Sequence, residues 1–112
     1  MLYIISGIVI KGDGYGRKLG FPTVNLDSET KKIPQDGIYS GTAVLEEKEY
    51  RAGIVIGPSD KIEAHLLGYN GDAYGKRVTL NINKFIRAYK KFNSEEELIM
   101  QIKKDLKLCS RE

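Results

Sequence analysis

The residues best suited to chemistry in this sequence lie between positions 12 and 25, in the segment GDGYGRKLGFPTVN. Glycine reaches positive φ and lets the backbone approach a ligand closely, because it has no Cβ. Arg17 and Lys18 add positive charge to the segment. The combination is typical of a phosphate-binding loop, although a glycine-rich stretch between apolar runs is also typical of a hairpin. The glycines concerned are Gly12, Gly14, Gly16 and Gly20.

Thr23 and Asn25, at the end of this segment, distinguish it from an ordinary hairpin loop. They lie two positions apart, so on an extended strand their side chains point to the same face. Two neutral oxygens there suit an Mg²⁺ ion that takes its other ligands from phosphates and water. The segment matches neither a P-loop nor a G-x-G-x-x-G that opens a helix. We therefore predict a metal and phosphate site of another kind at Thr23 and Asn25.

Glu63 is the candidate proton acceptor, and it begins an apolar run that contains Leu66 and Leu67. Phosphoryl transfer to an alcohol needs a positioned group that takes the hydroxyl proton, which a carboxylate can do. An arbitrary glutamate at a strand end is more commonly solvated, so the residue type alone leaves both interpretations open. His65 lies on the same strand face, where it either orients Glu63 or is structural; we favour the structural role.

The composition is that of an ordinary globular domain. The 112 residues suffice for one hydrophobic core and not for two domains, and the net charge of +3 supports an anionic ligand only weakly. Cys109 is the single cysteine, which excludes an internal disulfide and a zinc cluster, so we expect it to be a packing residue. No run is long enough to span a membrane. We expect a cytoplasmic monomer that binds neither nucleic acid nor membrane.

The elements that must position these residues are mostly strands. Short apolar runs separated by Gly, Asp and Pro are typical of a small antiparallel barrel or sandwich. We predict six strands, near 3–10, 23–27, 38–45, 50–56, 62–69 and 77–87, in a closed or nearly closed Greek-key barrel. Near the C-terminus the pattern changes to helical spacing: Ser94 and Glu97 form a capping box, and the apolar residues after them mark one amphipathic helix across the barrel.

The glycine-rich segment resembles the loop G-R-x-L-G-x-P-T-A-N of the ATP-dependent riboflavin kinases of bacteria and eukaryotes, with Val24 in place of the alanine. The resemblance continues in the same order along nearly the whole chain. Matching positions are Gly16, Arg17, Leu19, Gly20, Pro22, Thr23, Asn25, Gly37, Ile38, Tyr39, Ile56, Gly57, Glu63, His65, Leu67, Tyr74, Gly75, Arg87, Phe92, Ser94, Glu96, Leu98, Gln101, Ile102 and Asp105.

This resemblance implies that residues 1–112 form a single riboflavin kinase domain. It implies transfer of the γ-phosphate of ATP to the ribityl 5′-hydroxyl of riboflavin, giving FMN and ADP with Mg²⁺. Glu63 would be the catalytic residue, and Thr23 and Asn25 would bind both metal and phosphate. Gly12 and Arg17 would contact phosphates. Many bacterial members of the family also carry an FMN adenylyltransferase part, so the chain is expected to be either a stand-alone kinase or a fragment.

The remaining implied contacts lie on the adenosine and flavin sides. Leu66 and Tyr74 would lie against adenosine, although Tyr74 alone would be assigned as a core or surface aromatic. Arg87 and Lys90 would approach the flavin and its new phosphate, and their plainer interpretation is a basic strand end.

Two departures from the family pattern stand near the expected flavin position. Tyr89 replaces the usual glutamate, and segment 57–62 is shorter than in most members. A non-catalytic flavin- or nucleotide-binding barrel is therefore the alternative.

Overall fold

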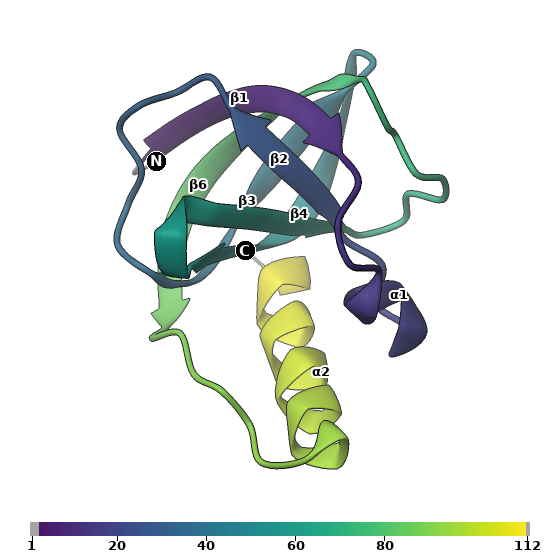
Figure 1. The fold of residues 1–112 in the computed structure, drawn as a ribbon, viewed down its shortest axis with the longest axis vertical. Coiled ribbons are helices and arrows are strands. Elements are labelled where there is room, and N and C mark those ends of the chain that lie inside the picture. The colour runs from purple at the N-terminus through teal and green to yellow at the C-terminus, as the bar shows by residue number, and fades with distance from the viewer. Residues whose placement is uncertain (1–2, 112) are drawn as a thin grey trace.

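The computed structural model describes residues 3–111, which form one closed six-stranded barrel and a long C-terminal helix (Figure 1). Around the barrel the strands follow the order β1-β2-β5-β4-β3-β6, and all neighbours are antiparallel. β3, β4 and β5 are successive, and β2 lies beside β5, which is a Greek-key arrangement as predicted. The strands are β1 (Tyr3–Ile10), β2 (Val24–Ser28), β3 (Gly37–Leu45), β4 (Lys48–Gly57), β5 (Lys61–Leu66) and β6 (Arg77–Arg87).

The strand boundaries agree with the sequence pattern to within about two residues, except at the end of β5. The predicted end at residue 69 is wrong, because the strand stops at Leu66 and the chain turns. The Tyr69 N–H donates to the Leu66 carbonyl at 3.3 Å, and Gly68 has φ 85°. Glycine adopts that left-handed conformation at low cost, so a turn forms at residues for which the apolar pattern predicted a longer strand.

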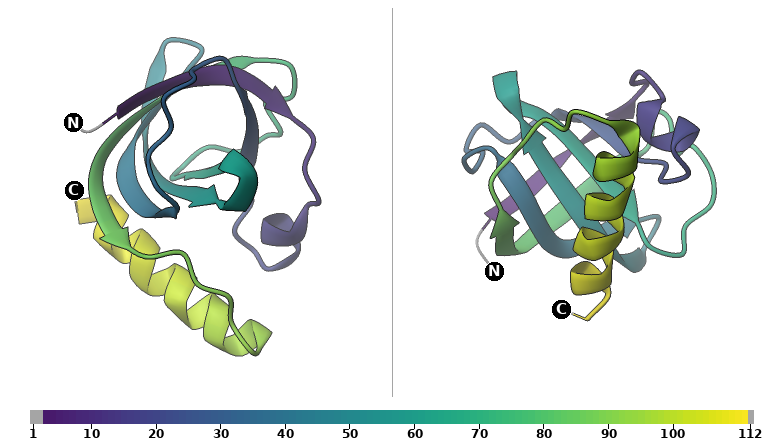
Figure 2. Two further views of the ribbon diagram at one scale, coloured as in Figure 1. Left: turned by 60° about the vertical axis from the view of Figure 1, so that its left-hand side comes forward. Right: turned by 90° about the horizontal axis from the view of Figure 1, so that it is seen from below.

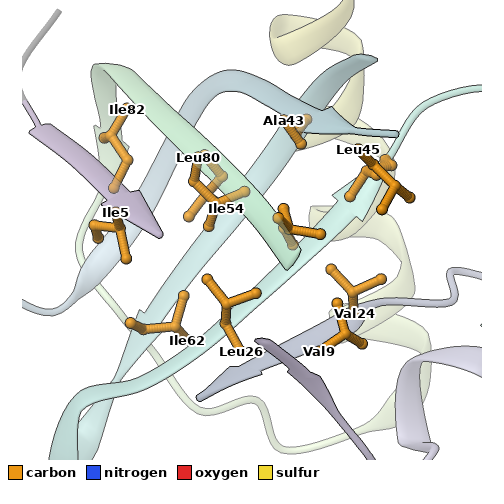
Figure 3. Packing of buried hydrophobic residues seen from close by; sticks show 14 of the residues in the cluster. Ile5, Val9, Val24, Leu26, Ala43, Leu45, Ile54, Ile62, Leu80 and Ile82 are labelled. Carbon is orange, nitrogen blue, oxygen red and sulfur yellow. The ribbon is translucent and has the colours of Figure 1, made fainter. Parts of the chain in front are cut away.

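The barrel interior is filled by side chains that alternate along each strand (Figure 3). On β6, Val78, Leu80 and Ile82 are fully buried, whereas Thr79 and Asn81 point outward and are only partly covered. This is the predicted period of two. On β5 the same alternation puts Ile62, Ala64 and Leu66 inside. The intervening residues of β5 therefore lie on the outer face of the barrel.

Helix α2 (Glu95–Arg111) lies against the outer face of the barrel, on β4 and β3 (Figure 2). Its start is capped as predicted, since the Glu97 N–H donates to the Ser94 Oγ at 3.2 Å. Gly53 makes the close approach possible: a Cβ there would stand 3.0 Å from Leu106 Cδ2 and 3.5 Å from Cys109 Sγ. Cys109 is fully buried in this contact, which confirms its predicted packing role.

An ion pair joins the last residue of β6 to α2. Arg87 donates from Nε to both Asp105 oxygens at 3.1 Å and from Nη2 to Oδ2 at 2.9 Å. Gln101 Nε2 donates to Asp105 Oδ1 at 2.9 Å. The two paired side chains are only 21% and 8% exposed.

Replacing Asp105 by Ala should therefore destabilise the domain by about 3 kcal/mol, because a mostly buried guanidinium loses its counter-charge. Chemical denaturation followed by circular dichroism measures the change. Arg77→Ala, which removes the solvent-exposed partner of Glu29, is the control and should alter the free energy of unfolding little. An equal effect of the two substitutions would contradict this account of the buried pair.

Candidate active site

A cleft of about 580 Å³ lies on the outer face of β4 and β5, between the glycine-rich segment and α2. Its floor carries outward-facing residues of the two strands. One side is formed by the glycine-rich segment with α1 (Tyr15–Lys18), and the other by residues 87–95 and α2. Figure 2 shows α1 and α2 on the same side of the barrel. The floor residues are Gly53, Val55, Lys61, Glu63 and His65.

Thr23 and Glu63 meet at the glycine-rich end of the cleft, although forty positions separate them in the chain. The Thr23 Oγ1 donates a hydrogen bond to Glu63 Oε1 at 3.2 Å. Asn25 pairs with Glu63 across β2 and β5, so that all three side chains belong to the outer face. Each is partly buried. The structure thus places the predicted base directly beside the predicted metal and phosphate ligands.

Two glycines leave the space that these polar side chains occupy. A Cβ on Gly12 would overlap the Asn25 amide and would stand 2.7 Å from its Oδ1. A Cβ on Gly16 would stand 2.6 Å from the Phe21 carbonyl and 3.5 Å from Thr23 Oγ1. Neither glycine is in the left-handed region, so close approach explains both of them better than backbone freedom does. The backbone here forms a cradle around Thr23 and Asn25.

This cradle fits a magnesium ion bound together with phosphates. It presents a hydroxyl and an amide oxygen, which are hard oxygen donors of the kind that Mg²⁺ takes in small number when phosphates supply the rest. Among residues 3–111 no group of three or more His, Cys, Asp or Glu side chains forms a metal site by itself.

Asp13 of the glycine-rich segment contacts both α1 and β5. Asp13 Oδ1 accepts from the Tyr15 N–H at 2.9 Å and so begins the single turn of α1. Asp13 Oδ2 lies 3.8 Å from Lys61 Nζ, and both side chains are more than half exposed. Arg17, predicted to contact phosphate, is exposed on α1 and does not line the cleft.

His65 has a structural contact in this site. Its Nδ1 lies 2.6 Å from the Pro22 carbonyl oxygen, to which the N–H tautomer donates. Its ring meets Phe21 edge-on, with centroids 6.3 Å apart. His65 therefore fixes the backbone immediately before Thr23, which supports the favoured structural role.

The two predicted adenosine contacts lie in different places. Leu66 is buried in the barrel and also lines a crevice of about 10 Å³ beside Pro22 and Thr23. Tyr74 is 47% exposed and lies outside the main cleft. The crevice is lined instead by Tyr69, which the sequence pattern had assigned to the strand.

Arg87 and Lys90 both line the far end of the cleft, but their charges differ in availability. Arg87 is held by Asp105, as described above. Lys90 is exposed, and its Nζ lies 5.3 Å from the centroid of the Phe92 ring. Lys90 is therefore the predicted cation that offers its charge to an incoming anion.

Several cleft residues were not singled out as ligand contacts from sequence. Phe21 and Phe92 supply aromatic surface to the cleft, and Lys61 supplies a cation two residues from Glu63 on β5. Lys61 follows from the period of two, since it lies on the same strand face as Glu63. Phe21 and Phe92 have no local signal of this kind, because Phe21 lies beside His65 of β5 and Phe92 beside Arg87 and Lys90 only in the folded chain.

The closed barrel, the glycine cradle and the carboxylate beside it define the class: a small β-barrel domain with a candidate metal and phosphate site. The family model described as "Flavokinase: Riboflavin kinase" matches residues 1–111, and the chain therefore belongs to the riboflavin kinase family.

One similar protein carries the family's name in a longer enzyme, and two solved structures share the fold. The bifunctional riboflavin kinase/FMN adenylyltransferase of Bacillus subtilis is 36% identical over 92% of this chain, and the chain spans 36% of that enzyme's length. A structure described as a macrolide-efflux protein from Streptococcus pneumoniae superposes with a TM-score of 0.90 at 30% identity, covering 96% of this chain and 38% of that one. Riboflavin kinase from Trypanosoma brucei shares the fold, with a TM-score of 0.71, 20% identity and coverages of 96% and 74%.

Proposed function

We propose that this domain transfers the γ-phosphate of ATP to the ribityl 5′-hydroxyl of riboflavin, giving FMN and ADP. The observation that carries the proposal is the hydrogen bond between Thr23 and Glu63 at the floor of the cleft. It places a carboxylate next to a cradle for metal and phosphate, and the same cleft continues toward Lys90. A cleft of about 580 Å³ falls within the usual range for small-molecule sites.

In the proposed reaction, the ribityl 5′-oxygen bonds to the γ-phosphorus while Glu63 accepts the proton of the 5′-hydroxyl. The bond from that phosphorus to the β,γ-bridging oxygen breaks, and ADP leaves with the electron pair. Thr23 and Asn25 would hold Mg²⁺, which supplies charge neutralisation on the phosphates when bound. The cradle orients the phosphate, and positioning of the two reactants provides much of the rate enhancement.

The remaining residues have proposed binding roles. Gly12 and Arg17 contact phosphates, and Leu66 and Tyr74 lie toward adenosine. Arg87 and Lys90 face the flavin and its new phosphate, with Lys90 the more available cation. Gly12, Arg17 and Tyr74 do not line the cleft, and Leu66 lines only the neighbouring crevice. These roles therefore require the glycine-rich segment and the 67–76 loop to close on the nucleotide.

We also propose that the sequence folds as one domain, as a monomer, and acts in the cytoplasm without nucleic acid or membrane partners. In the described residues no helix is long and apolar enough to cross a membrane. Size-exclusion chromatography with light scattering should give a mass near 12.6 kDa. A stable mass of twice that value would contradict the monomer.

The direct test of the activity is incubation of the purified domain with riboflavin, ATP and MgCl₂, followed by chromatography for FMN. We expect FMN and ADP in equal amounts, and no FMN when EDTA is added. Binding of riboflavin without FMN formation, across several divalent metals and nucleotides, would favour the non-catalytic binding barrel.

A further inference from the structure

We propose that Tyr89 supplies the aromatic face on which the isoalloxazine ring of riboflavin lies, an inference that rests on the proposed function. Tyr89 lines the cleft and is 37% exposed. A flat tricyclic ring needs a flat apolar surface, and an aromatic face offers one with favourable offset stacking. A glutamate at this position, as in the family pattern, has no such face.

Gly57 sets the position of the Tyr89 ring. The Tyr89 Cε1 lies 3.5 Å from the point where a Cβ on Gly57 would stand, so the ring packs against the end of β4. Gly57 pairs directly with Lys61 on β5. The two departures seen in the sequence, Tyr89 and the short 57–62 segment, therefore meet in one contact. The 3₁₀ turn Pro58–Asp60 keeps that segment compact beside the ring.

The spacing between Gly57 and Glu63 suits riboflavin. Lys61 is two residues from Glu63 on the same strand face, about 7 Å along the strand, and Gly57 lies opposite Lys61 on β4, about 5 Å to the side. The backbone of Gly57, against which the Tyr89 ring packs, thus stands roughly 8 Å from that of Glu63. An extended ribityl chain, with C–C bonds of about 1.5 Å, spans roughly 6 Å. A hydrogen bond of about 3 Å from the 5′-oxygen to Glu63 completes the span.

The other aromatic rings of the cleft are engaged elsewhere. Phe92 lies under two cations, with the Arg87 guanidinium carbon 5.5 Å and the Lys90 Nζ 5.3 Å from its centroid. Phe21 meets His65 edge-on. Tyr15 belongs to the glycine-rich segment, at the phosphate end. In residues 3–111, Tyr89 is the cleft aromatic at the α2 end for which no ring or cation contact is seen.

The test is titration of riboflavin fluorescence with protein in the presence of MgADP, so that no turnover occurs. Stacking on a tyrosine should quench the flavin strongly in the wild type. Tyr89→Leu should raise the Kd for riboflavin about tenfold and remove most of the quenching. Tyr89→Phe should keep the Kd within about threefold, because the ring face remains. The KM for riboflavin should follow the same order, with the KM for ATP unchanged.

Phe85→Leu is the control, since Phe85 is an exposed aromatic on β6 that packs on Tyr39 and does not line the cleft. Circular dichroism melting shows whether each variant is folded. Wild-type Kd and quenching in a folded Tyr89→Leu variant would overturn the inference while FMN formation by the wild type upheld the activity. A wild type that neither binds riboflavin nor forms FMN would overturn both proposals.

Discussion

Replacing Glu63 by Gln is expected to lower kcat by about 10²–10⁴, the usual contribution of a positioned general base. Glutamine retains an oxygen at the same place, so it can still accept the hydrogen bond from Thr23 Oγ1. The cradle should therefore remain intact while the group that takes the 5′-hydroxyl proton is lost. Riboflavin and MgADP should bind as in the wild type, which fluorescence titration and calorimetry measure.

Single-turnover kinetics make this test strict, because slow product release can mask a chemical step in kcat. A chemical rate within threefold of wild type would exclude Glu63 as the base. Glu63→Ala is the companion variant, since it removes the carboxylate and the hydrogen-bond acceptor together. This variant should lose turnover and also bind MgADP more weakly. The comparison with Glu63→Gln therefore separates the role of Glu63 as proton acceptor from its role as hydrogen-bond acceptor for Thr23.

Replacing Gly12 by Ala is expected to reduce kcat/KM for MgATP by about 10- to 100-fold, the range found when the support of a metal ligand is removed. The new Cβ would overlap the Asn25 side chain, which must then leave its position. Gly12 is not in the left-handed region, so alanine brings no backbone strain of its own. The melting temperature should change little, and the KM for riboflavin should stay near its wild-type value.

A double-mutant cycle shows whether Gly12 acts through Asn25. Asn25→Ala alone should cause a loss of similar size, because it removes the amide oxygen from the cradle. If the alanine at position 12 harms activity by displacing that amide, the double variant should be hardly worse than Asn25→Ala. Losses that multiply would show that Gly12 contributes independently, for example through its own contact with phosphate.

The sequence alone was enough to predict the barrel and the helix, and it proposed the residues of the site. Alternation on β6, from Val78 to Ile82, determines which face is buried, and the Ser94 cap marks where α2 begins. These are local signals, carried by residues two to four positions apart. The pairing of Thr23 and Asn25 was also local. The end of β5 was predicted wrongly because Gly68 forms a turn, although the residues around it are apolar.

Only the tertiary structure decided how residues distant in the sequence share the cleft. β2 pairs with β5 so that Asn25 lies opposite Glu63, and Thr23, just before β2, then reaches Glu63. That pairing joins strands that are distant in the sequence. The docking of α2 on the barrel pairs Arg87 with Asp105, whereas Lys90 stays exposed. Tyr89 likewise meets Gly57 at the end of β4, although the two residues lie far apart in the sequence. Sequence thus determined which groups this protein has for the proposed phosphoryl transfer, whereas three-dimensional packing determined which of them lie exposed in the cleft.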